Sequence, residues 1–347
     1  MRTIEWHNGI VTTIDQTKLP QKEVILKIKN LSEMAEAIKN MRVRGAPLIG
    51  ASAAYGLALT AFYSKVSNRE AFIKELKASE KILKSTRPTA VNLFWAIDRI
   101  LNKVKNSNKN LEETKQIVIQ EAQSIADEDV QTNLAMGKHG AALIYDGDVI
   151  LTHCNAGALA TVGYGTALGV IRTAWKQGKK IKVIATETRP LLQGARLTTY
   201  ELKRDGIPVK LITDNMAGFL IQKGMINKVI VGADRIVQDA IINKIGTFSL
   251  AVIANEYEVP FYVAAPKSTF DLSKKFREIT IEERKHNEVT HFRSLPVAPP
   301  GVDVFNPAFD ITPYKYISGI ICEDGVFFKK DFDTFGKNPF SKKKIVK

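Results

Sequence analysis

The residues best suited to chemistry in this sequence stand where short apolar runs end. Cys154 follows "DVILTH", and Asp234 follows "NKVIVGA". Glu187 and Asp214 come directly after "KVIAT" and "KLIT". A cysteine whose pKa is lowered becomes a thiolate base, and a buried carboxylic acid keeps its proton near neutral pH. An acid and a base of this kind, brought together, make a proton-transfer catalyst.

From residue 146 onward, β-branched runs alternate with stretches of helical pattern. This alternation predicts a parallel sheet with helices on both faces, a Rossmann-like doubly wound domain over residues 146–347. Ligands of such sheets bind outside the carboxyl ends of the strands. We therefore expect the four residues above to converge on one edge of the sheet. The predicted strands are "DVILTHC", "KKIKVIAT", "VKLITD", "NKVIVGAD" and "VPFYVAA", with helices over 163–177, 190–204, 216–223 and 246–257.

Residues 1–145 have a different pattern, which predicts a mainly helical domain with a few short β-strands. The first ~30 residues mix β-branched runs with turn residues, as antiparallel strands do. Asn30 and Glu33 have the spacing of a capping box at a helix start. The small residues of "APLIGASAAYGLALTAF" predict a buried helix, and apolar residues recur at helical spacing in "TAVNLFWAIDRILNKV" and from Leu111 to about Tyr145. The chain as a whole is thus predicted to belong to the α/β class.

Three segments place an arginine next to a glycine or proline at a predicted helix start. The free N–H groups and the positive dipole end of a helix suit phosphate, and an adjacent arginine adds a fixed cation. Together they indicate a small phosphorylated ligand. The segments are "RVRGAPLIG" with Arg44, Gly45 and Pro47, "TRPTAVN" with Arg87 and Thr89 as the helix cap, and "ETRPLLQGAR" with Arg189, Pro190 and Gln193.

The glycines after Cys154 do not form a dinucleotide fingerprint. "GYGTALG" begins nine residues after Cys154, whereas the fingerprint needs its glycines directly at the strand end. We expect these glycines to let a helix pack closely and a backbone approach a ligand.

Composition narrows the possible functions and the compartment. The 347 residues are 45% hydrophobic and 25% charged, as in a globular protein. The net charge is +14, but the lysines are scattered and no nucleic-acid-binding motif accompanies them, so no nucleic-acid partner is predicted. Two cysteines make no disulfide framework, which favours a reducing cytoplasm. The start lacks the apolar core of a signal peptide, and no apolar run reaches the roughly 18 residues of a membrane helix, so no membrane association is predicted.

Nine motifs together resemble the methylthioribose-1-phosphate isomerase family of methionine salvage, in order over residues 1 to about 330. The wider family includes ribose-1,5-bisphosphate isomerases and regulatory subunits of a translation initiation factor's nucleotide-exchange complex. "THCNAGALAT", and "GADRI" with "STFD", favour the methylthioribose branch. The motifs are "RVRGAPLIG", "RPTAVNL", "LTHCNAGALAT", "TETRPLLQGARLT", "DNMAG", "VGADRI", "NKIGT", "APKSTFD" and "NPAFDITP".

The resemblance implies a cofactor-free aldose–ketose isomerase that needs no metal and forms a homodimer. Its substrate would be a phosphorylated thiosugar, S-methyl-5-thioribose 1-phosphate. The matching motifs place the catalytic pair on Cys154 and Asp234. They place substrate binding on Arg44, Gly45, Ala46, Arg87, Gln193, Asn243 and Lys244.

One segment departs from the family pattern. Between "GADRI" and "NKIGT" this chain has "VQDAII", one residue shorter than usual and without the usual glycine. This leaves open isomerisation of a related sugar, such as 5-deoxyribose 1-phosphate or ribose 1,5-bisphosphate. A regulatory subunit without catalytic activity is the other alternative, although such a sensor would need neither Cys154 nor Asp234. A basic, mobile C-terminal tail is also predicted from "KNPFSKKKIVK".

Overall fold

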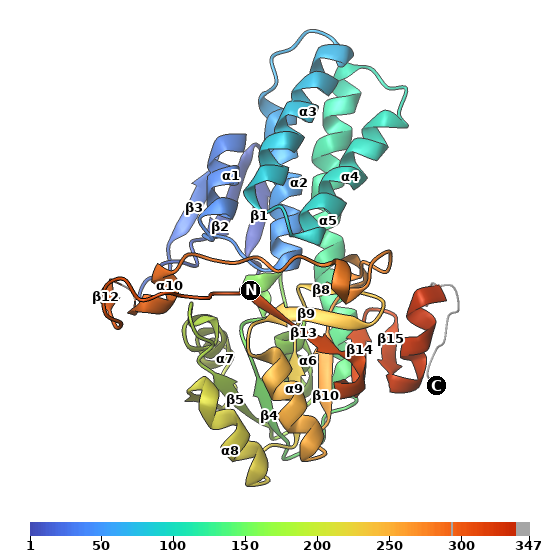
Figure 1. Ribbon diagram of the computed structural model, residues 1–347. Helices are drawn as coiled ribbons and strands as arrows, with labels where there is room; N and C mark the ends of the chain where they lie inside the picture. Colours follow the sequence, from blue (N-terminus) through green and yellow to red (C-terminus); the bar gives the residue numbers. More distant parts are fainter. Residues whose placement is uncertain (293, 338–347) are drawn as a thin grey trace. The chain divides into compact units, whose positions relative to one another are not determined.

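The chain forms two compact units in the computed structural model, which describes residues 1–292 and 294–337 (Figure 1). The first unit comprises Met1–Leu134 and Gly157–Gly169, and the second comprises Ala135–Ala156 and Val170–Lys347. The domain boundary predicted near residue 146 stays a prediction. The end of the basic tail, 338–347, lies outside the described residues.

The first unit combines a small antiparallel sheet with long helices, as predicted. Asn30 caps α1, since its side-chain oxygen accepts the Glu33 N–H at 2.9 Å. The Glu33 carboxylate accepts the Lys29 N–H at 2.8 Å, so the helix start is held from both sides. The elements are β1 (Ile4–His7), β2 (Ile10–Ile14), β3 (Ile25–Ile28), α1 (Leu31–Lys39), α2 (Ala46–Tyr63), α3 (Arg69–Thr86), α4 (Val91–Lys105) and α5 (Leu111–Ala141), whose last residues belong to the second unit.

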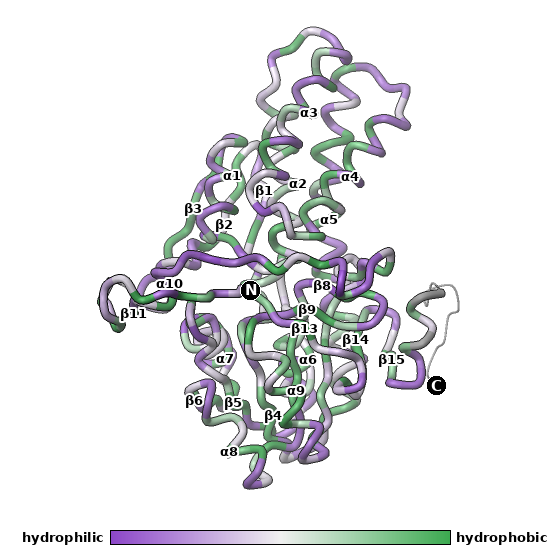
Figure 2. The backbone as a smooth tube through the Cα atoms, viewed as in Figure 1, coloured by the Kyte–Doolittle hydropathy of each residue, from purple (hydrophilic) through white to green (hydrophobic). Residues whose placement is uncertain are grey.

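Helix α2 is the central helix of this unit, and α1, α3 and α4 pack against it. Its small residues allow close approach: a Cβ on Gly50 would come within 2.9 Å of the Asn92 carbonyl oxygen in α4, and one on Gly56 within 3.0 Å of Leu83 in α3. The outer helices α3 and α4 alternate between hydrophobic and hydrophilic residues, as amphipathic helices do (Figure 2).

The prediction that no segment is long and apolar enough for a membrane span is wrong for α2. Its 18 residues have a mean hydropathy of 1.3, which meets the requirement by length and composition. The prediction underrated an uncharged run of alanine, glycine, serine and threonine. Because 78% of that segment is buried inside the protein, α2 is a core helix. No other helix in the described part of the chain meets the same requirement.

A seven-stranded sheet, of order β15-β14-β10-β7-β4-β5-β6, forms the centre of the second unit. Six strands are parallel, and β15 pairs with β14 in the antiparallel sense. The predicted doubly wound domain is confirmed, with its five predicted strands present. β14 and β15 were not predicted. The bounds are β4 (Val149–Thr152), β5 (Lys182–Thr186), β6 (Val209–Ile212), β7 (Lys228–Val231), β10 (Phe261–Ala264), β14 (Gly319–Cys322) and β15 (Gly325–Phe328).

The strand order reverses between β4 and β7. From β4 the chain proceeds outward through β5 to β6, then returns to β7 on the other side of β4 and proceeds outward through β10 to β14. In doubly wound folds this reversal opens a crevice at the carboxyl ends of the two central strands, where ligands bind.

Helices cover both faces of the sheet. On one face α8 (Ala217–Gln222) and α9 (Thr247–Glu256) share a core with Val229 and Ile320. On the other, Ile321 approaches Gly140 at the end of α5, and Gly140 approaches Val170 in α6 (Ala167–Lys176). Adjacent residues of one strand thus face opposite layers, as the period of two requires.

A small antiparallel sheet that the sequence did not predict lies in the same unit. β8 and β9 form a hairpin, and β13 pairs with β9. Figure 1 shows this sheet near the ends of the central strands. The remaining elements of the unit are β8 (Arg235–Ile236), β9 (Ala240–Lys244), β13 (Phe309–Pro313), α7 (Thr199–Arg204), α10 (Asn287–Thr290), β11 (His291–Phe292) and β12 (Leu295–Pro296).

Candidate functional site

Cys154 stands two residues beyond β4, between two anchored neighbours. His153 and Asn155 are 2% and 4% exposed, whereas Cys154 is half-buried. The His153 ring bonds to the Thr186 hydroxyl at 2.6 Å and to the Ile245 carbonyl oxygen at 2.8 Å. Burial lowers the pKa of His153, so its ring stays neutral. Of the three consecutive residues, the thiol-bearing one is the one left partly accessible.

The backbone of Cys154 is strained. Its φ is +62°, in the left-handed region that non-glycine residues avoid at a cost on the order of 1–3 kcal/mol. Its N–H donates to the Thr188 hydroxyl at 2.9 Å, and its carbonyl accepts from the Thr198 hydroxyl at 2.6 Å. Such strain persists only where surrounding interactions fix the backbone. Here the two threonine hydroxyls bond to the peptide groups on both sides of Cys154.

Asp234 lies three residues beyond β7 and is half-buried. β4 and β7 are parallel neighbours, so Cys154 and Asp234 follow the carboxyl ends of the two strands between which the order reverses. Glu187 and Asp214 follow β5 and β6 at the same edge, as expected. The Asp214 carboxylate accepts the N–H groups of Thr188 and Arg189, both at 2.7 Å, and so supports the backbone.

The β8–β9 hairpin brings Asp234 and Asn243 to its open end. Arg235 pairs with Ile242, and the Asp234 N–H donates to the Ile242 carbonyl oxygen at 3.0 Å. Gln238 and Asp239, within the segment "VQDAII", form the tip. The tip therefore lies at the opposite end of the hairpin from Asn243 and Lys244.

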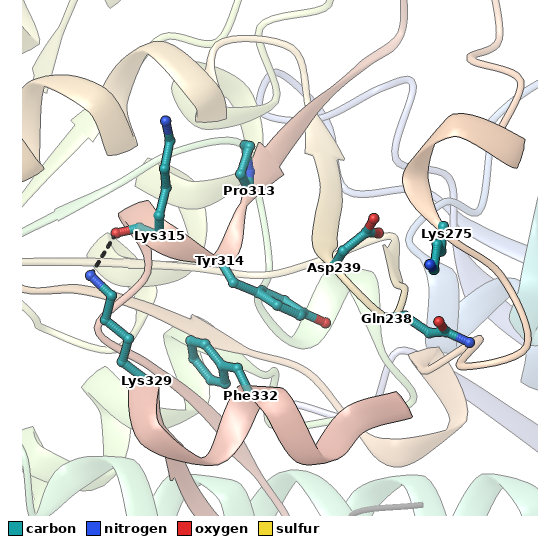
Figure 3. A pocket seen from close by; sticks show the side chains of 8 residues that line it. All are labelled: Gln238, Asp239, Lys275, Pro313, Tyr314, Lys315, Lys329 and Phe332. Atoms are coloured by element: carbon teal, nitrogen blue, oxygen red, sulfur yellow. Dashed lines mark hydrogen bonds between the residues drawn. The ribbon is translucent and has the colours of Figure 1, made fainter. Parts of the chain in front are cut away.

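A cavity of about 540 Å³ opens beside the hairpin tip (Figure 3). Tyr314 anchors the tip, since its hydroxyl donates to the Val237 carbonyl oxygen. The cavity is thus set apart, along the hairpin, from the end that carries Asp234. It is lined by Gln238, Asp239, Lys275, Pro313, Tyr314, Lys315, Lys329 and Phe332.

Asn243 and Lys244 are buried, and their side chains have partners within the second unit. The Asn243 side chain donates to the Thr247 hydroxyl at 3.0 Å. The Lys244 amine donates to the Ala308 carbonyl oxygen at 2.8 Å and lies 4.8 Å from the centre of the Phe309 ring. Across β13, Asp310 pairs with Asn243, and burial raises the pKa of Asp310 to about 6.

Gln193 precedes a single turn of π-helix, Gly194–Thr198. The side chain is 7% exposed, and its Oε1 has no hydrogen-bond partner among the described residues. A Cβ on Gly194 would come within 1.8 Å of the Thr186 carbonyl oxygen, so only glycine fits there. π-Turns are common at functional sites, and a buried acceptor without a partner suits a ligand hydroxyl.

Arg44, Gly45 and Ala46 open α2 in the first unit. Gly45 has a φ of +99°, and a Cβ there would come within 2.6 Å of Ala160. No side chain caps the helix, and Pro47 has no N–H to offer. The Arg44 Nε donates to the Gln16 side-chain oxygen at 2.9 Å, which orients the guanidinium.

Two of the predicted helix starts are wrong. Thr89 does not cap a helix: Arg87 ends α3, and α4 begins after Ala90 without a side-chain cap. Helix after Arg189 begins at Gly194 rather than Pro190. The Arg189 guanidinium donates to the carbonyl oxygens of Pro190 and Val289, so bonds to the protein backbone occupy it.

Several residues around Cys154 were not predicted, among them a buried polar network. The Arg172 guanidinium pairs with Glu201 at 2.7 Å, and Glu201 accepts from Asn155 at 2.9 Å. Thr188 and Thr198 belong to the same surroundings. Their only sequence signal is their position inside the quoted motif "TETRPLLQGARLT". Within the described ranges, no group of three or more His, Cys, Asp or Glu side chains is placed to hold a metal ion.

Comparison with known proteins identifies the family. Residues 42–329 match the initiation factor 2 subunit family. The methylthioribose-1-phosphate isomerase of Acetivibrio thermocellus is 54% identical over 331 residues, which are 94% of this chain and 97% of that protein. The crystal structure of 5-methylthioribose 1-phosphate isomerase from Pyrococcus horikoshii OT3 has a TM-score of 0.91 and 49% identity, covering 98% of this chain and 95% of that one. The chain belongs to the methylthioribose-1-phosphate isomerases of this family.

The predicted family resemblance is thus confirmed, and with it the class of enzyme, an aldose–ketose isomerase. The family also contains a crystal structure described as translation initiation factor eIF-2B, subunit delta, from A. fulgidus. It is 51% identical, with a TM-score of 0.85, and covers 94% of this chain and 96% of that one. Members of this family therefore share one fold under two functional descriptions.

Proposed function

We propose that this protein converts S-methyl-5-thioribose 1-phosphate into S-methyl-5-thioribulose 1-phosphate in methionine salvage. The observation that carries the proposal is the placement of Cys154 and Asp234 beyond adjacent parallel strands, on the two sides of the strand-order reversal. Two relatives that are 54% and 49% identical to this chain are named for this activity.

Asp234 acts as the acid. The phosphate on the anomeric oxygen prevents the sugar from opening by loss of a hydroxyl proton. Ring opening instead needs a proton on the ring oxygen, after which the bond from C1 to that oxygen breaks. A half-buried carboxyl after a buried strand is suited to hold that proton. The carboxylate then takes the C2 hydroxyl proton as the ketone forms.

Cys154 serves the hydrogen transfer from C2 to C1. As a thiolate it takes the C2 proton and returns it to C1 through an enolate, or it stabilises the transition state of a hydride shift. A reaction run in D₂O separates these routes, because exchange at an enolate places deuterium on C1 and a hydride shift does not.

The remaining candidates hold the substrate. Arg44, the N–H groups of Gly45 and Ala46 at the start of α2, and Arg87 bind the phosphate, since Arg–phosphate bonds are charge-assisted. Arg44→Ala should raise KM at least 10-fold and leave the folded protein intact. Unchanged KM and kcat/KM would remove Arg44 from this role.

Three further residues are proposed to bind the sugar hydroxyls. Gln193 has a buried oxygen without a partner among the described residues, which supports its role as an acceptor. Asn243 and Lys244 follow Asp234 across the hairpin and complete the set. No cofactor takes part in the reaction.

Product formation by the purified protein tests the proposal. S-methyl-5-thioribose 1-phosphate should react with a higher kcat/KM than 5-deoxyribose 1-phosphate or ribose 1,5-bisphosphate. A reversed preference would assign the enzyme to the related sugar.

A second candidate is a regulatory subunit, because a 51% identical structure is titled as a subunit of a translation initiation factor. Binding of the three sugars without product from any of them would favour it. We also propose a cytoplasmic homodimer, to be checked by the mass of the purified protein in light scattering.

A further inference from the structure

The hydroxyls of Thr188 and Thr198 bond to the two ends of the same residue, Cys154. The first accepts its N–H at 2.9 Å, and the second donates to its carbonyl at 2.6 Å. Both threonines are 0% exposed, so water does not compete for these bonds. They come from separate segments, one after β5 and one at the end of the π-turn.

Thr188 is itself held firmly. Its φ is +65°, and its N–H donates to the Asp214 carboxylate at 2.7 Å. Its position is therefore set by a charged group that follows β6, and it has little freedom to follow a movement of Cys154.

Thr198 is held by a different set. Asn155 donates to its hydroxyl at 3.2 Å and to Glu201 at 2.9 Å, and Arg172 pairs with Glu201. At the other end of the π-turn, Gly194 packs against the Thr186 carbonyl so closely that no side chain fits. The two threonines are thus held by different groups: the Asp214 carboxylate fixes Thr188, and the Asn155, Glu201 and Arg172 side chains fix the surroundings of Thr198.

We propose that Thr188 and Thr198 are positioning residues that hold Cys154 in its left-handed conformation and so aim its thiol at the substrate. This inference rests on the proposed function of Cys154. In the left-handed region the Cα–Cβ bond points in a direction that the relaxed β or right-handed conformations do not reproduce. Without either hydroxyl the backbone relaxes, and the sulfur moves while the binding residues stay in place.

Valine variants remove each hydroxyl and keep its shape. In Thr188→Val and Thr198→Val, kcat should fall about 10- to 100-fold, as for an ångström-scale misplacement of a reacting group, with KM within about 3-fold. Thr188→Ser and Thr198→Ser should restore most of kcat. Thr199→Val is the matched control, since among the described residues that hydroxyl bonds to the Ala195 carbonyl oxygen one turn earlier and not to Cys154.

The thiol itself supplies a readout that does not depend on turnover. The rate of Cys154 alkylation by iodoacetamide, measured against pH, should change in both valine variants and return to the wild-type profile in the serine variants. Where a valine variant does not fold, the alanine variant at that position, which is smaller and also lacks the hydroxyl, replaces it.

Folded valine variants with wild-type kcat and alkylation profile would overturn the inference. Equal losses in valine and serine variants would also overturn it, because packing rather than the hydroxyl would then matter. Failure of the proposed function would give a different result from failure of this inference. Cys154→Ser would then keep full activity, and the threonine variants would alter alkylation without altering kcat.

Discussion

The two cysteines of the chain both lie at the carboxyl ends of parallel strands in the second unit, in opposite surroundings. Cys322 is the last residue of β14, is 0% exposed and pairs with Gly325 in the next strand. Burial raises the pKa of its thiol to about 12. Cys154 lies past its strand, half-buried, with left-handed backbone and both peptide groups bonded by threonines.

The difference teaches that a position at a strand end does not by itself make a cysteine accessible. Within a strand, pairing with the neighbouring strand directs a residue into one of the two packed layers, as with Cys322. Cys154 is not directed into a packed layer, because the chain turns after Thr152 and buries His153 and Asn155 instead. The turn requires partners from β5, the π-turn and the segment after β9, so it depends on the assembled sheet.

The largest expected effect is the difference in kcat between serine variants of the two cysteines. Cys154→Ser should lower kcat by about 10²- to 10⁴-fold with KM little changed, because serine has no thiolate at neutral pH. Cys322→Ser should keep kcat and lose stability, about 1–3 kcal/mol, since it buries a hydroxyl. Steady-state kinetics and urea unfolding measure both.

The same test extends to Asp234, the proposed acid. Asp234→Asn should match the loss in Cys154→Ser, and the double variant should lose far less than the product of the two, because the pair acts as a unit. Fully multiplicative losses would assign the residues to separate steps.

Alkylation compares the same thiols without substrate. In the folded protein iodoacetamide should modify Cys154 at least about 100-fold faster than Cys322, because the thiolate is the reactive form and Cys322 is inaccessible and protonated. Mass spectrometry of the peptides gives both rates, and in urea the two should converge. Equal rates in the folded state would contradict the comparison.

The rigidity of the surroundings of Cys154 is tested at a glycine. Gly194→Ala should destabilise the protein by about 3 kcal/mol or more, since its Cβ would lie 1.8 Å from the Thr186 carbonyl oxygen. Gly218→Ala in α8 is the control, with 3.4 Å to the nearest atom, and should leave the free energy of unfolding equal or up to about 1 kcal/mol higher. Urea unfolding measures the free energy of unfolding of both variants. Equal stabilities would show that the π-turn shifts to accommodate the added methyl group.

The smallest effect concerns Asp310, whose carboxylate accepts the Gly246 N–H at 2.7 Å. Its pKa is raised from 3.8 to about 6 by burial, so the folded protein binds this proton more tightly than the unfolded chain. Its contribution to stability is therefore greatest below pH ~4 and falls as the pH rises through about 6. Relative to Asp310→Asn, the wild type should lose on the order of 2 kcal/mol between pH 4 and pH 7.

Urea unfolding of the wild type and Asp310→Asn at these two pH values measures the change. The pH-dependent contributions of other groups, including His153, are the same in both proteins and cancel in the difference between their free energies of unfolding. The hydrogen bonds that Asp310→Asn loses change that difference by the same amount at both pH values. A difference that does not vary with pH, or varies in the opposite sense, would mean that burial does not disfavour this carboxylate.

The sequence predicted the parts of the fold that follow from local pattern. The five strands from "DVILTHC" to "VPFYVAA" are present, and Asn30 caps α1. β8 and β9 were missed, because a hairpin with a tip of ordinary residues, Gln238 and Asp239, carries no glycine signal. β14 and β15 were missed because short apolar runs after residue 265 lack a strong period.

The residues of the candidate site were likewise predicted only in part. Cys154 and Asp234 were named because an unusual residue after an apolar run is visible in the sequence. Thr188 and Thr198 were not, because their bonds to Cys154 join residues 34 and 44 positions apart. Thr89 was expected to cap a helix, since local composition allows it, but α4 begins one residue later.

The sequence by itself determined the alternation of strands and helices, and with it which residues stand at strand ends, because hydrophobic period and turn residues act over a few positions. Its motifs also determined the family. Only the tertiary structure decided the strand order, which sets β4 beside β7 and so Cys154 on the edge that carries Asp234. It alone also decided the left-handed backbone of Cys154. A strained dihedral angle persists only where hydrogen bonds from distant segments outweigh its cost, and no local stretch of sequence contains them.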